Sequence, residues 1–395
     1  MKQSIASLAL FLILPLLFFF VMEDFSALFE KSDASLVMKE EKPPITLAEP
    51  PALSLSAKHA VLMTDQGHIV YGKNEHVPTE MASTTKVMTG YLAAEYLEKH
   101  GLKAKTVVQK SAVGIEGSSV YLEEGEEVAI VDLLYAVMLA SANDAAVALA
   151  EAIGGTSENF VAMMNATADE MCLAGTHFEN PHGLSAEGHT TTAYSLALLM
   201  ARAMENTLFA RVTATGQYTM KSNVATRYLV NHNRLLNAYD GIIGGKTGFT
   251  KRAGRCLVSA AERDGAKFYA VTLSAPDDWN DHKTLYDHAF SSWEAIKIPA
   301  FRLTLPTVSG KESHATVTSR EITLTLPKNR GEIAILREAP RFLYAPVAEG
   351  DVVGNVTVTL SGKPIATVDL YNEKTVSADY EKSFFEKLLS WIRKG

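Results

Sequence analysis

This sequence of 395 residues contains little cysteine, has no net positive charge and shows no standard pattern of metal ligands. Its two cysteines, Cys172 and Cys256, exclude a disulfide framework and leave open one bridge or none. The 37 basic residues stand against 45 acidic ones, and the net charge of −8 gives no reason to expect nucleic acid as a partner. His177, His182 and His189 follow no standard ligand spacing, so we expect no metal site. The remaining composition, 47% hydrophobic and 21% charged, is typical of a globular protein of two or three domains.

One long apolar run stands at the N-terminus. Residues 5–22 are almost entirely apolar and follow Lys2, which is typical of an export signal or a membrane anchor. Pro15 and the polar residues that follow argue against a buried core helix. We therefore predict a signal peptide or an N-terminal anchor over residues 1–34, with cleavage left open, and a proline-containing linker over residues 35–52. The rest of the chain is expected to work outside the cytoplasmic membrane.

A serine and a lysine, Ser83 and Lys86, form the only S-x-x-K pattern in the sequence. The apolar residues that follow have helical spacing up to Gly101, so the pair is predicted at a helix N-terminus, where positions i and i+3 share a face. A lysine held neutral by burial or by a cationic neighbour accepts a proton from serine. Because N–H groups at a helix N-terminus also favour an oxyanion, the pair predicts a nucleophile and its base.

Two further short motifs follow. Ser141-Ala-Asn143 interrupts the helical stretch 132–152, and alone it indicates only a helix junction with local capping. Lys246-Thr-Gly248 precedes a β-hairpin turned at Asp264-Gly265, so it is predicted on or beside a strand. A phosphate-binding loop requires a helix after such a string, and the hairpin excludes it.

The rest of the chain divides by pattern. A hairpin is predicted over 60–71 and a helix over 277–296. After Pro299, segments such as 321–326 and 355–360 alternate with period two, which is typical of strands.

We therefore predict a catalytic domain over residues 53–298, a small all-β domain over 299–376 and an amphipathic C-terminal helix over 377–395. The last segment is typical of a helix lying on a membrane surface, and the alternative is a helix docked on its own domain. Its apolar face would consist of Phe384, Phe385, Leu388, Leu389 and Ile392.

Together and in this order, the three motifs resemble the active-site set of the penicillin-binding proteins and serine β-lactamases. Within that group the chain is similar to the low-molecular-weight D-alanyl-D-alanine carboxypeptidases, serine peptidase family S11, and the resemblance covers nearly the whole chain. The matching text is Ser83-Thr-Thr-Lys-Val-Met-Thr89, Gly117-Ser-Ser119, Ser141-Ala-Asn-Asp144, Asn180-Pro-His-Gly-Leu184 and Gly245-Lys-Thr-Gly248.

The resemblance implies an α/β (α+β) fold: a β-lactamase/transpeptidase-like domain, with an antiparallel sheet flanked by helices, and a small all-β C-terminal domain. It implies removal of the terminal D-alanine from peptidoglycan stem pentapeptides, covalent inhibition by β-lactams, and no metal or organic cofactor. It also implies a location at the outer face of the bacterial cytoplasmic membrane, in the periplasm or cell-wall space, in contact with the membrane surface.

The resemblance further assigns catalytic roles. Ser83 would attack the carbonyl of the penultimate D-alanine and become an acyl ester, and Lys86 would take its proton. Ser141 and Lys246 would supply a proton relay and positive charge beside the leaving amine.

The substrate-binding roles are implied in the same way. Asn143 would hold the substrate amide, and Lys246 and Thr247 the terminal carboxylate. Gly248 would let the substrate approach the strand closely, and the oxyanion hole would be the N–H groups of Ser83 and Phe249. The family's carboxylate-binding arginine aligns with His232, with Arg234 close by, which leaves open which of the two, if either, contacts substrate.

Rival functions share parts of this set. A class A β-lactamase also needs a glutamate with an asparagine four residues on, and no glutamate after Asn143 has that spacing. D,D-endopeptidase action on cross-links and transpeptidation use the same acyl-enzyme and stay open. A non-catalytic wall-binding penicillin sensor would not need the intact catalytic set.

Overall fold

The structure is a computed structural model that describes residues 52–379, and residues 1–51 and 380–395 lie outside the described part. The predicted leader, nearly all of the linker and most of the C-terminal amphipathic segment fall there. No helix within 52–379 has the length and apolar character needed to cross a bilayer.

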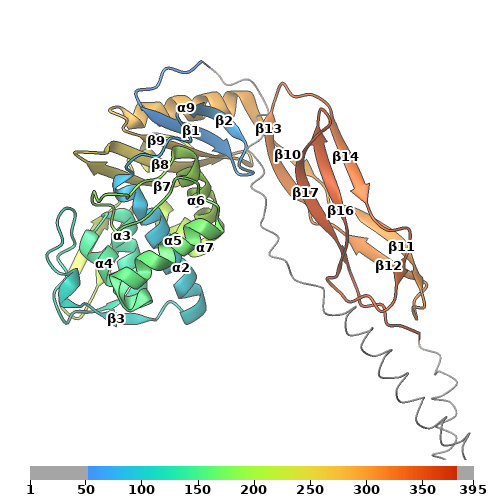
Figure 1. Ribbon diagram of the computed structural model, residues 1–395, viewed down its shortest axis with the longest axis horizontal. Helices are drawn as coiled ribbons and strands as arrows, with labels where there is room; N and C mark the ends of the chain where they lie inside the picture. Colours follow the sequence, from blue (N-terminus) through green and yellow to red (C-terminus); the bar gives the residue numbers. More distant parts are fainter. Residues whose placement is uncertain (1–51, 380–395) are drawn as a thin grey trace, which may run out of the picture. The chain divides into compact units, whose positions relative to one another are not determined.

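An antiparallel sheet of five strands organises the first part of the described chain (Figure 1). Its order is β2-β1-β9-β8-β7, so the first hairpin and the last three strands are joined through the pairing of β1 with β9. The bounds are β1 His59–Thr64, β2 Ile69–Lys73, β7 Ile242–Thr250, β8 Gly254–Arg263 and β9 Ala266–Leu273.

The hairpin turns follow from local chemistry. Asp264 and Gly265 both have positive φ, 50° and 82°, as a two-residue turn between right-handed twisted strands requires. Both predicted hairpins, at 60–71 and around Asp264-Gly265, are confirmed.

Both faces of the sheet are buried, which explains the nearly continuous apolar strands. Val61 and Met63 face a large helical layer, whereas Ala60 and Leu62 face α9 on the other side. Figure 1 shows α9 on one face of the sheet and the other labelled helices on the opposite side, where α6 packs against β9 and α7 against β7. The helix bounds are α2 Lys86–His100, α3 Ile130–Leu139, α4 Asn143–Gly154, α5 Ser157–Glu170, α6 Ala193–Glu205, α7 Thr207–Ala214, α8 Leu235–Ala238 and α9 Asp278–Ser292.

Short elements connect these layers. The 3₁₀ turns η1 (Ala82–Thr85) and η2 (Lys110–Ala112), and the two-stranded ribbons β3–β4 and β5–β6, complete this part of the fold. The strand bounds are β3 Lys105–Val107, β4 Glu127–Ala129, β5 Gln217–Lys221 and β6 Thr226–Val230.

One element differs from the prediction. The helix predicted over 277–296 ends at Ser292, and Trp293–Ile298 is strand β10, paired with β13 (Ile322–Pro327). The segment Trp293-Glu-Ala-Ile-Lys-Ile298 carries apolar residues at alternate positions near its end, and pairing with a distant strand decides its conformation.

The remaining strands form an all-β region. A six-stranded sheet has the order β14-β16-β17-β12-β11-β15, in which only β11 and β15 are parallel. Its cores are small and aliphatic, with Val317, Val356 and Leu370 fully buried. The bounds are β11 Arg302–Val308, β12 His314–Thr318, β13 Ile322–Pro327, β14 Ile333–Glu338, β15 Leu343–Tyr344, β16 Val352–Leu360 and β17 Lys363–Asn372.

Candidate active site

Ser83 lies in η1, immediately before α2, and this short turn packs against strand β7. A Cβ added to Gly248 would come within 3.0 Å of the backbone nitrogens of Ser83 and Thr84. Only glycine therefore lets β7 approach the turn so closely. The backbone nitrogens of this turn therefore lie against strand β7, beside the hydroxyl of Ser83.

Lys86 is the first residue of α2 and is completely buried. Its Nζ lies 3.1 Å from Ser83 Oγ and 2.7 Å from Asn143 Oδ1. Burial lowers the pKa of Lys86 well below its ordinary value, and the charge of Lys246 lowers it further. Burial is therefore the larger cause of a neutral amine, and the cationic neighbour is the smaller one.

Asn143 and Ser141 mark the junction of α3 and α4, as predicted. Ser141 has a left-handed backbone with φ of 57°, which ends α3 sharply and turns the chain into α4. The Asn143 side chain lies between two partners, since Oδ1 accepts from Lys86 and Nδ2 donates to the Glu116 carbonyl at 2.5 Å. A Cβ on Gly117 would approach that Nδ2 to 2.8 Å, so glycine is needed there too.

Lys246 lies on the edge strand β7 and is also buried. Its Nζ donates to Ser141 Oγ at 3.0 Å and to the Thr247 carbonyl at 2.9 Å. Burial lowers its pKa to about 7. Phe249, two residues beyond Thr247, has 66% of its surface exposed at the mouth of the site.

A loop that the sequence does not connect to the site completes the surroundings of Lys86. The Nζ of Lys86 donates to the backbone carbonyl of His182 at 2.5 Å, and Thr89 Oγ1 donates to that of Pro181 at 2.6 Å. Asn180 Oδ1 accepts from the N–H groups of His182 and Gly183 and so fixes the turn. The turn Asn-x-x-Gly is recognisable in the sequence, but its partner lysine is 96 residues away.

The buried His189 supports the same region. Its Nδ1 accepts from the N–H of Glu179, so its Nε2 carries the proton and donates to Thr85 Oγ1 at 2.7 Å. Burial lowers the pKa of His189 to about 4, and it is therefore neutral at physiological pH. Within residues 52–379 no cluster of three candidate ligands could hold a metal ion.

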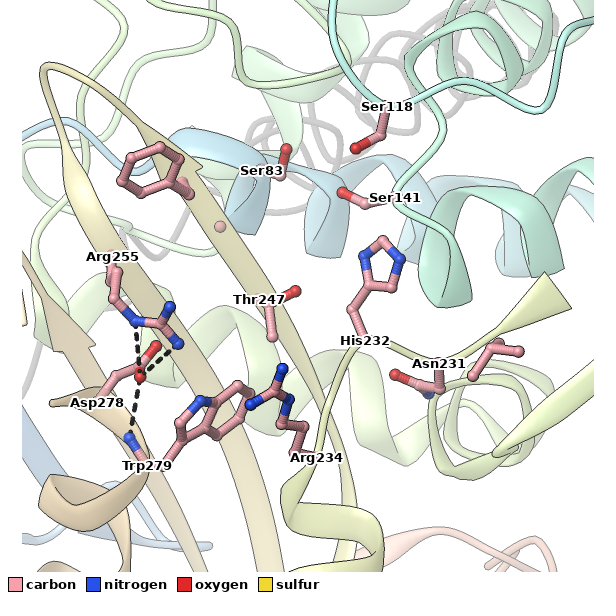
Figure 2. Close-up of a pocket in the computed structure, with 13 residues that line it drawn as sticks. Ser83, Ser118, Ser141, Asn231, His232, Arg234, Thr247, Arg255, Asp278 and Trp279 are labelled. Atoms are coloured by element: carbon pink, nitrogen blue, oxygen red, sulfur yellow. Dashed lines mark hydrogen bonds and ion pairs between the residues drawn. The ribbon is translucent and has the colours of Figure 1, made fainter. Parts of the chain in front are cut away.

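Ser83, Ser141 and Thr247 are among the residues that line a cleft of about 590 Å³ (Figure 2). His232 lies beside Ser141 and Ser118, whereas Arg234 lies near Thr247 and Trp279. Both residues at the position left open by the sequence thus reach the cleft. Arg255 lines it too, but its guanidinium is paired with Asp278 at 2.8 Å.

The two cysteines lie apart from this chemistry. Cys172 is exposed, Cys256 is buried on β8, and both are free thiols. Cys172 and Cys256 therefore form no disulfide bridge with each other.

Two family models match consecutive parts of the chain. Residues 45–277 match the model described as D-alanyl-D-alanine carboxypeptidase, and residues 303–378 match the penicillin-binding protein 5 C-terminal domain. The chain belongs to the D-alanyl-D-alanine carboxypeptidase family. The predicted family, α/β fold class with an added β domain, and hydrolase activity are confirmed.

Relatives of this carboxypeptidase cover most of its length. The D-alanyl-D-alanine carboxypeptidase DacF of Bacillus subtilis is 33% identical over 80% of this chain and 84% of its own. DacC of Escherichia coli is 30% identical over 86% of this chain and 88% of its own. The crystal structure of penicillin binding protein 5 from Haemophilus influenzae superposes with a TM-score of 0.70 at 28% identity, over 84% of this chain and 99% of that one.

Members of this family act on the D-alanyl-D-alanine ends of peptidoglycan peptides, and penicillin-binding proteins bind β-lactams. The chain is accordingly a serine D-alanyl-D-alanine carboxypeptidase.

Proposed function

We propose that Ser83 is the residue acylated in this reaction and that Lys86 is its general base. The observation that carries the proposal is the 3.1 Å separation of Lys86 Nζ and Ser83 Oγ, within reach of proton transfer. A neutral Lys86 takes the hydroxyl proton as Oγ attacks the carbonyl of the penultimate D-alanine. The developing oxyanion is stabilised by the N–H groups of Ser83 and Phe249.

The leaving D-alanine is handled by the second lysine and its partners. Ser141, bonded to Lys246 at 3.0 Å, passes a proton to the leaving amine, and the acyl ester is then hydrolysed by water. Lys246, Thr247 and a cation above them hold the terminal carboxylate. Arg234 suits that last role, since it lines the cleft and its guanidinium lies near Thr247 (Figure 2).

Asn143 holds the substrate amide, with its own amide already oriented by Lys86 and the Glu116 carbonyl. No carboxylate is a hydrogen-bond partner of Ser83 or Lys86 in the described part of the chain, where both instead contact the His182 carbonyl. This supports slow hydrolysis of a penicilloyl ester, as expected of a carboxypeptidase that β-lactams inhibit, over a β-lactamase.

The test uses the wild-type enzyme. Labelled penicillin is expected to form one adduct, located on Ser83 by peptide mass spectrometry, and a Lys–D-Ala–D-Ala peptide is expected to release one D-alanine. If the wild-type enzyme forms no adduct, the assignment of Ser83 as the acylated residue is contradicted. If it hydrolyses penicillin rapidly, the protein is a β-lactamase instead.

We also propose that the enzyme works at the outer face of the bacterial cytoplasmic membrane, in the periplasm or cell-wall space. Residues 1–34 would export or anchor it, and residues 377–395 would lie on the membrane, with the catalytic domain over 53–298 and the β domain over 299–376 between them. Support comes from the apolar run and the amphipathic pattern in the sequence.

Deleting residues 381–395 is expected to lower the membrane-bound fraction strongly. Five large apolar side chains would be lost from the membrane surface, which predicts a fall of at least about 100-fold in the partition coefficient. The measurement is sedimentation with vesicles of bacterial lipid, and a variant lacking residues 1–34 is the control. If the deleted protein still sediments with vesicles, the N-terminal segment is the anchor and the prediction is wrong.

A further inference from the structure

The proposed reaction uses none of the side chains in a polar cluster at the end of strand β7. The cluster consists of Glu80 just before η1, Ser185 in a loop, Thr250 on β7 and Arg252 in the turn between β7 and β8. Ser185 Oγ lies 3.2 Å from Glu80 Oε2 and 3.4 Å from Thr250 Oγ1. Arg252 forms an ion pair with Glu80. The cluster therefore offers a carboxylate, a guanidinium and two hydroxyls at one place.

The alternation of side chains along β7 places this cluster relative to the nucleophile. Lys246, Gly248 and Thr250 occupy alternate positions, so they face the same side of the strand. Gly248 lies against the backbone nitrogen of Ser83. Lys246 is two positions away in one direction and Thr250 two positions away in the other. The cluster is thus on the opposite side of the nucleophile from the lysine that serves the leaving D-alanine.

The loop that carries Ser185 is held close to the same turn. Gly183 has φ of 90°, and a Cβ added to it would lie 2.9 Å from the Cα of Ser83. Only a glycine lets the loop pass so near the nucleophile. Two residues later, Ser185 meets Thr250 and Glu80, so the loop and the end of β7 lie on two sides of the cluster.

Under the proposed function, the part of the stem peptide that stays on Ser83 extends toward this cluster. The leaving carboxylate is held at Thr247, so the retained chain runs the other way, past Gly248 toward Thr250. An extended residue covers about 3.3–3.6 Å, which is close to the rise of a strand. The residue before the penultimate D-alanine therefore reaches the level of Thr250, and in the Lys–D-Ala–D-Ala peptide this residue is the diamino acid.

The side chain of a diamino acid at this position ends in an ammonium alone, as in lysine, or in an ammonium and a carboxylate on the same carbon. The cluster has a partner for each group. The Glu80 carboxylate suits the ammonium, and the Arg252 guanidinium suits the carboxylate, which it can bind through two hydrogen bonds. The Glu80 side chain is 17% exposed and that of Arg252 is 68% exposed. The glutamate is therefore fixed by its surroundings, whereas the arginine extends into solvent.

The number of ion pairs favours the substrate that carries both charges. When such a side chain binds, the pair of Glu80 with Arg252 is exchanged for two pairs, one with the ammonium and one with the carboxylate. Lysine in the same place displaces Arg252 from Glu80 and leaves the arginine unpaired. A side chain whose carboxylate is replaced by an amide has the same disadvantage.

We propose that Glu80 and Arg252 bind the side-chain end of the diamino acid, and that the enzyme thereby prefers stem peptides in which this end carries both an ammonium and a carboxylate. The inference rests on the proposed function of Ser83 and Lys86, which sets the direction of the bound peptide. It adds a specificity site to the retained half of the substrate.

The experiment measures D-alanine release by the full-length protein in detergent from three pentapeptides. They carry lysine, diaminopimelate, or diaminopimelate with its side-chain carboxylate amidated. For the wild type, kcat/KM for the diaminopimelate peptide should be about fivefold higher than for either of the others, the effect of one additional, partly exposed ion pair. This comparison of substrates needs no variant.

Two substitutions in the same ion pair have different expected effects. In Arg252→Gln the carboxylate loses its partner and Glu80 becomes available to lysine, so the ratio of kcat/KM for diaminopimelate to that for lysine should fall to one or below. In Glu80→Gln the unpaired Arg252 still binds the carboxylate and repels the lysine ammonium, so the ratio should stay near fivefold or rise. An ion pair that only stabilises the fold would change both ratios alike.

A similar ion pair in the all-β region provides the control. Arg302 and Glu373 are 69% and 24% exposed, and Arg302→Gln and Glu373→Gln should keep the wild-type ratio. Penicillin has no diamino acid, so its labelling of each variant reports whether Ser83 still becomes acylated.

Three results overturn the proposal. A wild type that releases D-alanine equally from all three peptides has no such preference, while the proposed function stands. A preference that survives Arg252→Gln places the recognition of the carboxylate elsewhere. A wild type that neither binds penicillin nor releases D-alanine from any peptide removes the proposed function and this inference with it.

Discussion

Replacing Ser83 with alanine is expected to abolish covalent β-lactam labelling and to lower kcat/KM for D-alanine release by about 10⁴-fold or more. The reason is that no acyl-enzyme forms without Oγ, and the remaining groups only bind the substrate and polarise its carbonyl. Intact-protein mass spectrometry after incubation with labelled penicillin gives the first result, and an assay of free D-alanine gives the second.

The structure makes this substitution a clean one. Among residues 52–379, Ser83 Oγ makes two hydrogen bonds, with Lys86 Nζ at 3.1 Å and with the His182 carbonyl at 3.4 Å, so its loss should leave the cleft intact. Ser313→Ala, an exposed serine on the all-β region, makes the same chemical change far along the chain and should keep full activity. An adduct that persists in Ser83→Ala would place the nucleophile elsewhere and refute the assignment.

Local rules explain which parts of the fold the sequence could predict. The hairpin turn at Asp264-Gly265 needs residues that tolerate positive φ, and Gly101 ends α2 with φ of 85°. The serine and lysine of the first motif share a helical face because of their spacing alone. Each of these features depends on a few consecutive residues, so it can be read without knowledge of the fold.

Long-range strand pairing explains why the end of the helix predicted over 277–296 was wrong. Trp293–Ile298 follows α9 without a proline or glycine to end the helix, and the sequence therefore predicts that the helix continues. Its strand conformation comes from pairing with Ile322–Pro327, about 30 residues later. A helix end that depends on a distant partner has no signature in its own residues.

The candidate active site also contains features that the sequence predicts and features that it does not. Ser83, Lys86, Ser141 and Lys246 could be predicted from the sequence, because the chemistry proposed for the site requires those side chains. The carbonyl of His182 contacts Lys86 as closely as any of them, yet a backbone carbonyl is present in every residue and carries no sequence signal. Burial is the main cause of the lowered pKa of Lys86, and a short polar motif does not reveal that its lysine will be buried. The smaller cause, the charge of Lys246, can be anticipated because the second lysine is itself part of a motif.

Replacing Lys86 with methionine is expected to slow acylation by about 10²–10⁴-fold, the usual contribution of a general base. Methionine has nearly the shape of the lysine stem and fills the buried site without a basic nitrogen. The measurement is the rate of labelling by a fluorescent penicillin at saturation, across a range of pH.

The pH dependence distinguishes a base from a structural group. In the wild type the rate should fall as pH decreases through the lowered pKa of Lys86, because the protonated amine cannot accept the serine proton. Lys86→Met should lose this acid limb, since no group titrates at that position. Lys86→Arg retains the positive charge but does not release its proton, so it should be as slow as the methionine variant.

The contacts of Lys86 give the matching stability result. In Lys86→Met the Asn143 Oδ1 and the His182 carbonyl lose a buried donor, and each unsatisfied acceptor costs about 1–3 kcal/mol. Thermal unfolding should therefore shift to lower temperature, although the protein stays folded. Lys86→Arg with the wild-type rate and acid limb would show that Lys86 only holds charge, and another base would then have to serve Ser83.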